Sequence, residues 1–217
     1  MLSNRLRILY LHGFASSRGS RKAKFFADKL AAEGAQVDIP ALDRGDFPHL
    51  TITGQLNVVE ESVRDEPVVL IGSSLGGYVA ALYAARHLNV LRVLLLAPAF
   101  RFYDLWTSGM DPEKLRDWRK SGLLPIFHYG EGREQSIGYQ LIEDAAKYEP
   151  WPDFKQPALI FHGIGDTAVP VEYSVEFVKN HTNSRLIEMD SGHELTDVLD
   201  AIWERSKGFL VSGQTVL

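Results

Sequence analysis

The sequence predicts an α/β protein built on a mostly parallel, doubly wound sheet with helices on both faces. Three observations support this prediction: short runs of consecutive apolar residues, stripes of apolar residues at helical spacing between them, and glycine or proline where one kind of segment ends. A strand that is apolar along its whole length is buried on both faces, as in a parallel sheet. Strands that alternate with helices supply the crossover connections of such a sheet.

The predicted elements follow one another in a regular order. Apolar runs predict strands at 6–11, 35–39, 68–71, 90–96, 158–161 and 185–189. Helical stripes predict helices at 21–33, 51–64, 75–88, 171–180 and 195–209. In parallel sheets the functional residues lie in loops beyond the carboxyl ends of the strands. The loops at that edge are predicted at 12–20, 72–76, 163–170 and 190–194.

One stretch departs from this alternation. Residues 100–151 hold 10 of the 23 aromatic residues and three of the four tryptophans, and glycines at 130, 132 and 138 interrupt the stretch. We expect a short, aromatic-rich cap insertion that passes over the carboxyl edge of the sheet. Trp106 and Trp118 are candidate contacts for an apolar part of a substrate, and the alternative is that they only pack a small core of their own. With 217 residues, the chain is expected to form a single domain over 1–217.

Composition excludes several classes of function. The net charge is −5, and the chain has no basic run that would indicate a nucleic-acid partner. It has no apolar stretch as long as a membrane span, and the first apolar run ends at once in His12-Gly13, unlike a secretory signal. Without cysteine, disulfide and thiolate chemistry are excluded. We therefore expect a cytoplasmic protein.

Neither a metal ion nor a cofactor is expected. The histidines are scattered, and His193-Glu194 does not continue into a zinc-binding H-E-x-x-H pattern because position 197 is Asp. The chain also lacks the glycine-rich patterns of phosphate and dinucleotide loops.

A nucleophile is predicted at Ser74. Gly72-Ser73-Ser74-Leu75-Gly76 matches G-x-S-x-G, follows an apolar strand and opens an apolar helix. In that setting the central serine sits on a sharp, strained turn that lifts its hydroxyl above the sheet. Glycine at both ends suits so tight a turn. The alternative is that Ser73 or Ser74 only caps the helix.

The partners of Ser74 are predicted from chain order. A serine hydroxyl needs a neighbouring base to take its proton, and in this arrangement the order is Ser, then an acid, then His. His193 follows the last predicted strand and Asp166 follows the strand before it, so both converge on the edge that carries Ser74. Asp190 is the alternative acid, although its nearness to His193 in sequence makes a correctly oriented pair harder to form.

An oxyanion hole is predicted from backbone amides. Acyl transfer builds negative charge on the substrate oxygen, which preorganised N–H groups stabilise. One donor is the residue after the nucleophile, Leu75, and the other comes from the loop after an early strand. Phe14 is the candidate there, because Gly13 lets the backbone approach the substrate closely.

Together these motifs resemble the α/β-hydrolase superfamily over about residues 5–210. The opening YLHGFASS at 10–17 and the elbow IGSSLGGY at 71–78 resemble small bacterial esterases of the YqiA type. The elbow, the aromatic insertion and HGIGD at 162–166 are also similar to mitochondrial depalmitoylating hydrolases. The resemblance implies the α/β-hydrolase fold and hydrolysis of a small-molecule carboxylic ester or thioester. It places a triad at Ser74, Asp166 and His193, and an oxyanion hole at Phe14 and Leu75.

Other functions stay open on the sequence alone. A serine peptidase, a cofactor-free lyase or a perhydrolase can use the same triad, and a fold does not fix its chemistry. A non-catalytic binding module would usually lack one triad member, whereas all three are present here.

Overall fold

The computed structural model describes residues 6–212. Residues 1–5 and 213–217 lie outside the described residues, so the expectation that the chain does not begin with a secretory signal stays a prediction. A six-stranded sheet has the order β2-β1-β3-β4-β7-β8, and every neighbouring pair is parallel. The strands are β1 (Arg7–Leu11), β2 (Gln36–Asp38), β3 (Val68–Ser73), β4 (Val90–Leu96), β7 (Ala158–Gly163) and β8 (Ser184–Met189). The predicted parallel sheet is therefore confirmed.

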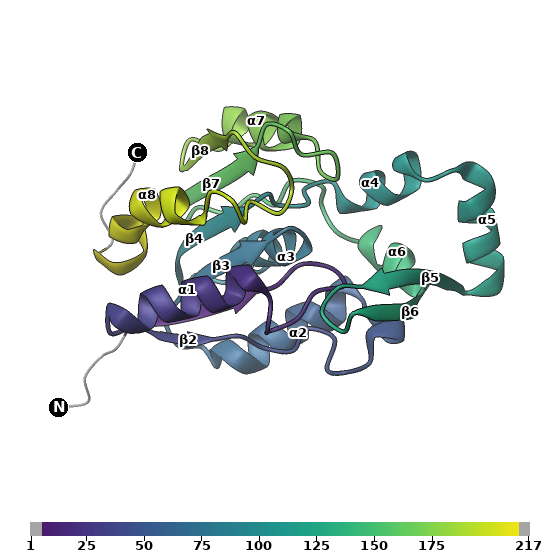
Figure 1. Cartoon of the computed structure of the whole chain (residues 1–217), viewed down its shortest axis with the longest axis horizontal. Helices are drawn as coiled ribbons and strands as arrows, with labels where there is room; N and C mark the ends of the chain where they lie inside the picture. The colour runs from purple at the N-terminus through teal and green to yellow at the C-terminus, as the bar shows by residue number, and fades with distance from the viewer. Residues whose placement is uncertain (1–5, 213–217) are drawn as a thin grey trace.

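Helices cover both faces of this sheet (Figure 1). One face carries α1 (Arg21–Ala32) and α8 (Leu199–Ser212), and the other carries α2 (Ile52–Val63), α3 (Leu75–Ala84) and α7 (Val171–Asn180). Successive strand residues point to opposite faces. Accordingly, Ile8 and Tyr10 belong to the core under α1 and α8, while Leu9 and Leu11 belong to the core under α2 and α3. This arrangement confirms the doubly wound class.

Local chemistry sets the helix ends. Ser20 caps α1 by accepting a hydrogen bond from the Ala23 amide at 3.2 Å, and Thr51 caps α2 in the same way. The largest departures from the predicted bounds are four residues each and fall at two helix ends. The helix predicted to reach 88 ends at Ala84, and the last helix begins at Leu199 rather than at 195. Leu195 has φ 54°, a left-handed conformation that is unfavourable inside a right-handed helix, and residues 195–198 form a turn and a bend before the helix begins.

The insertion forms a separate layer at one end of the sheet (Figure 1). It contains α4 (Phe102–Gly109), α5 (Pro112–Ser121), an antiparallel hairpin of β5 (Leu123–His128) and β6 (Arg133–Gly138), and α6 (Gln140–Ala145). The hairpin was not predicted from the sequence. The two ends of the insertion meet, because the Arg101 amide donates to the Pro150 carbonyl at 2.9 Å.

Polar contacts fix the insertion to the body. The buried Asp144 of α6 accepts hydrogen bonds from the amide and the hydroxyl of Thr53, at 2.7 and 2.8 Å. The hairpin turn approaches the loop after β1, where the Gly130 amide donates to the Ala15 carbonyl at 3.1 Å. A Cβ at Gly130 would lie 2.7 Å from the Cβ of Ser17. Gly130 is thus a point of close packing. The remaining short element is the 3-10 helix η1 (Phe47–His49), which contacts β6.

Candidate active site

Ser74 lies on the sharp turn between β3 and α3. Its backbone has φ 53° and ψ −120°, a strained conformation for a residue with a side chain. The two glycines of the pattern are required by packing. A Cβ at Gly72 would lie 2.6 Å from the Cα of Gly77, and one at Gly76 would lie 2.5 Å from the carbonyl oxygen of His12. The Ser74 amide donates to the Leu96 carbonyl of β4 at 2.9 Å, which anchors the turn to the sheet.

The structure brings His193 between Ser74 and Asp166. Its Nε2 atom is 3.0 Å from Ser74 Oγ, and its Nδ1 atom is 2.7 Å from Asp166 Oδ2. A carboxylate only accepts hydrogen bonds, so Nδ1 carries the hydrogen and Nε2 presents its lone pair to the serine hydroxyl. The loops that carry the histidine and the aspartate are joined directly, because the Gly165 amide donates to the Ser191 carbonyl at 3.0 Å.

Asp166 is held as a carboxylate. Its side chain is fully buried, and Oδ1 accepts hydrogen bonds from the amides of Ala168 and Val169, both at 2.8 Å. Burial alone would raise the pKa of Asp166. Hydrogen bonds from His162, His193 and the Val169 amide outweigh burial and hold that pKa well below its usual range.

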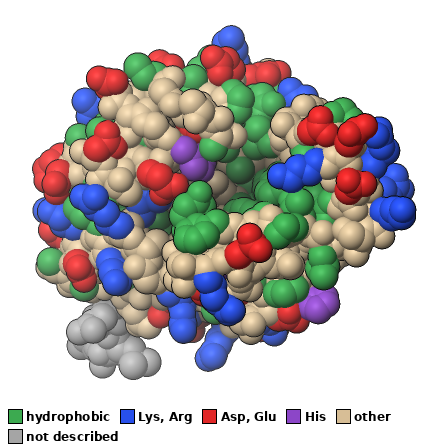
Figure 2. Space-filling view, turned by 45° about the vertical axis from the view of Figure 1, so that its right-hand side comes forward, with side chains coloured by type: hydrophobic (Ala, Val, Ile, Leu, Met, Phe, Trp, Pro, Cys, Tyr) green, Lys and Arg blue, Asp and Glu red, His purple; other side chains and the backbone are tan. Residues whose placement is uncertain are grey.

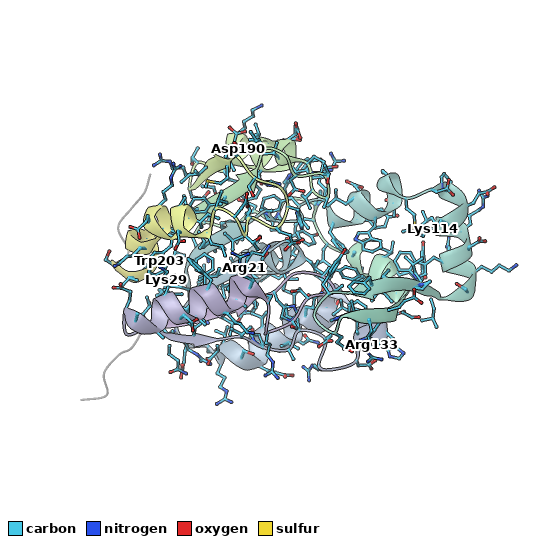
Figure 3. All side chains as sticks on the ribbon, in the orientation of Figure 1. Arg21, Lys29, Lys114, Arg133, Asp190 and Trp203 are labelled. Atoms are coloured by element: carbon cyan, nitrogen blue, oxygen red, sulfur yellow. The ribbon has the colours of Figure 1, made fainter. Side chains whose placement is uncertain are left out.

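The alternative acid lies elsewhere. Asp190 is exposed at the end of β8 (Figure 3). The carboxylate that accepts from His193 Nδ1 is that of Asp166.

His162, near the end of β7, also contacts Asp166, and the sequence did not predict this contact. His162 Nε2 is 2.9 Å from the Val169 carbonyl and 3.2 Å from Asp166 Oδ2. A carbonyl oxygen only accepts, so Nε2 carries the hydrogen, and Nδ1 accepts from the Ser174 hydroxyl at 2.8 Å. The available signal was its place at the end of β7, four residues before Asp166.

The two predicted oxyanion donors border Ser74. Leu75 is the first residue of α3, so its N–H has no acceptor within the helix. Phe14 lies in the loop after β1, next to Gly13, and a Cβ at Gly13 would lie 3.3 Å from the Cβ of Ser74. The backbone of this loop therefore passes directly against the serine, and both Phe14 and Leu75 line the same cleft.

That cleft has a volume of about 1240 Å³ and opens beside Ser74 and His193. Figure 2 shows a hollow bordered by hydrophobic side chains. Its apolar wall, which comes largely from the insertion, is formed by Phe14, Ala99, Phe102, Leu105, Trp106 and Met110. Its polar wall, which comes largely from the loop after β1 and the start of α1, is formed by Tyr10, Ser16, Ser17, Ser20, Arg21, Lys22, Glu194 and Thr196.

The two candidate tryptophans have different positions. Trp106 lines the cleft and packs edge-on against Phe14, with ring centroids 5.2 Å apart. The structure does not place Trp118 in the cleft. Trp118 is 1 % exposed and lies behind Trp106 at 5.4 Å, and its indole N–H donates to the Ile137 carbonyl at 3.0 Å. A buried indole N–H usually has a hydrogen-bond acceptor. For Trp118 this acceptor is a carbonyl of β6, so its indole N–H is directed toward the hairpin and not toward the cleft.

Two negative findings apply to residues 6–212. None of the helices there is long and apolar enough to cross a membrane. Within the same residues, His, Asp and Glu side chains do not gather in groups of three or more that could hold a metal ion.

Solved structures establish the fold. Est1E from Butyrivibrio proteoclasticus, solved with ferulic acid bound, superposes with a TM-score of 0.79 at 22 % identity, over 95 % of this chain and 88 % of that chain. Alpha/beta hydrolase domain-containing protein 10 from mouse superposes with a TM-score of 0.76 at 18 % identity, over 91 % and 88 %. The predicted α/β-hydrolase fold is confirmed.

Sequence comparison gives curated relatives and one family. Monoacylglycerol lipase abhd6-B from Xenopus laevis is 26 % identical over 181 residues, which are 77 % of this chain and 50 % of that protein. The chain thus spans about half the length of the curated relative that it matches. A family model matches residues 7–210, which shows that the chain belongs to the uncharacterised protein family UPF0227.

Proposed function

We propose that this protein hydrolyses carboxylic esters or thioesters through an acyl-enzyme formed on Ser74. The observation that carries the proposal is the continuous chain from Asp166 through His193 to Ser74, with contacts of 2.7 and 3.0 Å, on a strained turn at the wall of a cleft. This is the arrangement of a nucleophile, its base and an orienting acid. Ester chemistry is further supported by the monoacylglycerol lipase named above, whose sequence is related to this chain.

In the first half of the proposed reaction, His193 Nε2 takes the hydroxyl proton of Ser74 while Oγ attacks the substrate carbonyl carbon. The carbonyl oxygen becomes an oxyanion, which the N–H groups of Phe14 and Leu75 stabilise. One such donor is typically worth about 3–4 kcal/mol. The tetrahedral intermediate then expels the alcohol or thiol, which receives the proton from His193, and the acyl group stays on the serine.

In the second half, water replaces the alcohol. His193 takes a proton from water as the water oxygen attacks the acyl carbon, and then returns that proton to Ser74 Oγ when the carboxylic acid leaves. Asp166 stabilises the imidazolium in both halves. Burial would raise the pKa of Asp166, but the hydrogen bonds from His162 and His193 lower it. Asp166 therefore stays ionised and can stabilise the imidazolium.

The apolar wall of the cleft is the proposed site of the acyl chain. Phe102, Leu105, Trp106 and Met110 offer it aliphatic and aromatic surface, and each buried methylene contributes about 0.8 kcal/mol. Because the insertion is small, we expect short to medium chains to be preferred. Trp118 supports this wall from behind.

Covalent labelling tests the proposal. A fluorophosphonate should label the purified protein at Ser74, and Ser74→Ala should lose the label together with nearly all hydrolysis of p-nitrophenyl butyrate. Ser73→Ala is the matched neighbour and should keep the label. If Ser74→Ala were still labelled, or kept more than about a tenth of the turnover, the assignment of the nucleophile would be wrong.

A further inference from the structure

The polar wall of the cleft brings positive charge close to Ser74. Arg21 and Lys22 open α1 and line the cleft beside His193 and Glu194. Figure 3 places Arg21 at the end of α1 that lies toward the insertion, and Lys29 toward the opposite end. The first turn of α1 has no acidic residue, so the partial positive charge of the helix N-terminus is uncompensated there.

The net charge of the residues that line the cleft is opposite in sign to the net charge of the whole chain. Arg21, Lys22 and Lys114 line the cleft against Asp111 and Glu194, a balance of three positive charges to two negative. The whole chain carries a net charge of −5. An acidic protein thus presents a net positive lining in its cleft, which favours an anion.

Two buried polar groups in this wall have only weak or distant partners. Tyr10 is fully buried, and its hydroxyl has no hydrogen-bond partner within 3.5 Å, the nearby polar side chain being that of Ser73. Lys22 has a side chain only 9 % exposed, and its nearest carboxylate, Glu194, is 3.5 Å away and largely in solvent. Burial lowers the pKa of Lys22, and the charge and hydrogen bond of Glu194 together with the charge of Asp166 offset this lowering only in part. An acceptor that carries negative charge would satisfy both groups.

Resting on the proposed function, we propose that this wall binds a carboxylate or phosphate group on the leaving-group side of the substrate. The apolar wall takes the acyl chain, so the alcohol or thiol part extends along the polar wall, past Tyr10 toward Arg21 and Lys22. The substrate class is then an acyl ester or thioester of an acidic alcohol or thiol. The hydroxyls of Ser16, Ser17 and Ser20 lie along the same wall and offer further donors to an anion.

A different role for Lys22 makes a different prediction. If Lys22 only pairs with Glu194 and so holds the loop that carries His193, then its loss would slow every ester alike. If Lys22 instead binds the anion, its loss would slow hydrolysis of anionic esters more than that of neutral ones. The ratio between an anionic ester and its neutral counterpart therefore separates the two roles.

The experiment compares kcat/KM for hexanoyl glycolate with neutral hexanoyl glycolamide, and for 2-(hexanoyloxy)ethyl phosphate with 2-hydroxyethyl hexanoate. The wild type should favour at least one anionic ester by about tenfold, the effect of one charge-assisted hydrogen bond. Lys22→Met, Arg21→Gln and Tyr10→Phe should each reduce that preference, with Lys22→Met removing most of it. Lys29→Met, on the same helix and outside the cleft, should leave the preference unchanged. Whether carboxylate or phosphate is favoured identifies the anion.

Three results would overturn the inference. The first is no preference for either anionic ester, and the second is an equal loss for both esters of a pair in Lys22→Met. The third is a preference for p-nitrophenyl monoadipate over p-nitrophenyl hexanoate, which would put the anion at the acyl end.

Calorimetric binding of hexanoyl glycolate and of its amide to Ser74→Ala measures the subsite without turnover. If the anionic ester bound more tightly there while the wild type hydrolysed no ester, the subsite would stand and the proposed function would fail.

Discussion

Replacing Asp166 by Asn gives the sharpest test of the proposed chemistry, because the consequence follows from hydrogen-bond polarity. Asp166 Oδ1 accepts from the amides of Ala168 and Val169. An Asn at this position keeps those two bonds only by placing its carbonyl oxygen there. Its NH2 group then replaces Oδ2 and faces the Nδ1 atom of His193, which is 2.7 Å from Oδ2 in the wild type.

An NH2 group facing Nδ1 would change the tautomer of His193. Nδ1 must then accept, so the hydrogen moves to Nε2, which points at Ser74 Oγ from 3.0 Å. In that tautomer His193 has no lone pair with which to take the serine proton. A wrong tautomer of this kind costs about 10⁴ in kcat, which corresponds to about 5.4 kcal/mol.

The assay is kcat on p-nitrophenyl butyrate, with Tm measured alongside. Asp166→Asn should lose about 10³–10⁴ in kcat, and the adjacent charge control Asp190→Asn, which alters an exposed side chain, should stay within about twofold. The reasoning would be refuted by Asp166→Asn that keeps more than a tenth of the activity, or by Asp190→Asn that is the more damaging of the two.

The remaining predictions concern the cleft wall and the attachment of the insertion. Trp106→Ala should shift the kcat/KM profile of p-nitrophenyl esters from acetate to palmitate while Tm changes little, and an unchanged profile would place the acyl chain elsewhere. Asp144→Asn should cost roughly 1–3 kcal/mol of unfolding free energy at pH 7, because the buried carboxylate accepts two hydrogen bonds from Thr53. Burial would raise the pKa of Asp144, but these bonds and Lys147 lower it from 3.8, so its contribution is complete above that value and lost as the pH falls through the lowered one. Urea unfolding at pH 7 and at pH 3 should therefore show that Asp144→Asn loses less stability on acidification than the wild type does, and an equal loss would contradict this.

Much of the fold was predictable because burial on both faces leaves a direct trace in sequence. All six residues of β3 are buried, and such a strand reads as one apolar run. The hairpin of β5 and β6 left no such trace. β6 begins Arg133-Glu134-Gln135, which are largely solvent-facing, and β5 contains Pro125. Its pairing depends on contacts with η1 and Trp118 that no local pattern reports.

Some residues of the candidate site could likewise be predicted from the sequence, and others could not. Ser74, Asp166 and His193 each follow a strand, and parallel strands bring their carboxyl ends to one edge, so their proximity could be predicted. Tyr10 lies within an apolar strand and looks like a core residue, while Lys22 lies on an amphipathic helix and looks solvated. Recognising them requires knowing that both side chains face one cleft, which depends on how α1 packs on the sheet.

The loop after β1 joins the parts of the site into one unit. Near its start, the loop passes against Ser74 at Gly13, and Phe14 packs against Trp106 of the insertion. Further along, Ser17 lies against Gly130 in the hairpin turn. The same loop leads directly into Arg21 at the start of α1. A displacement of the insertion therefore cannot leave the proposed oxyanion donor in place, because the intervening contacts are close-packed and yield little. The apolar wall, the backbone beside Ser74 and the polar wall are consequently set at fixed spacing from one another, as the proposed substrate with one apolar and one anionic end would require.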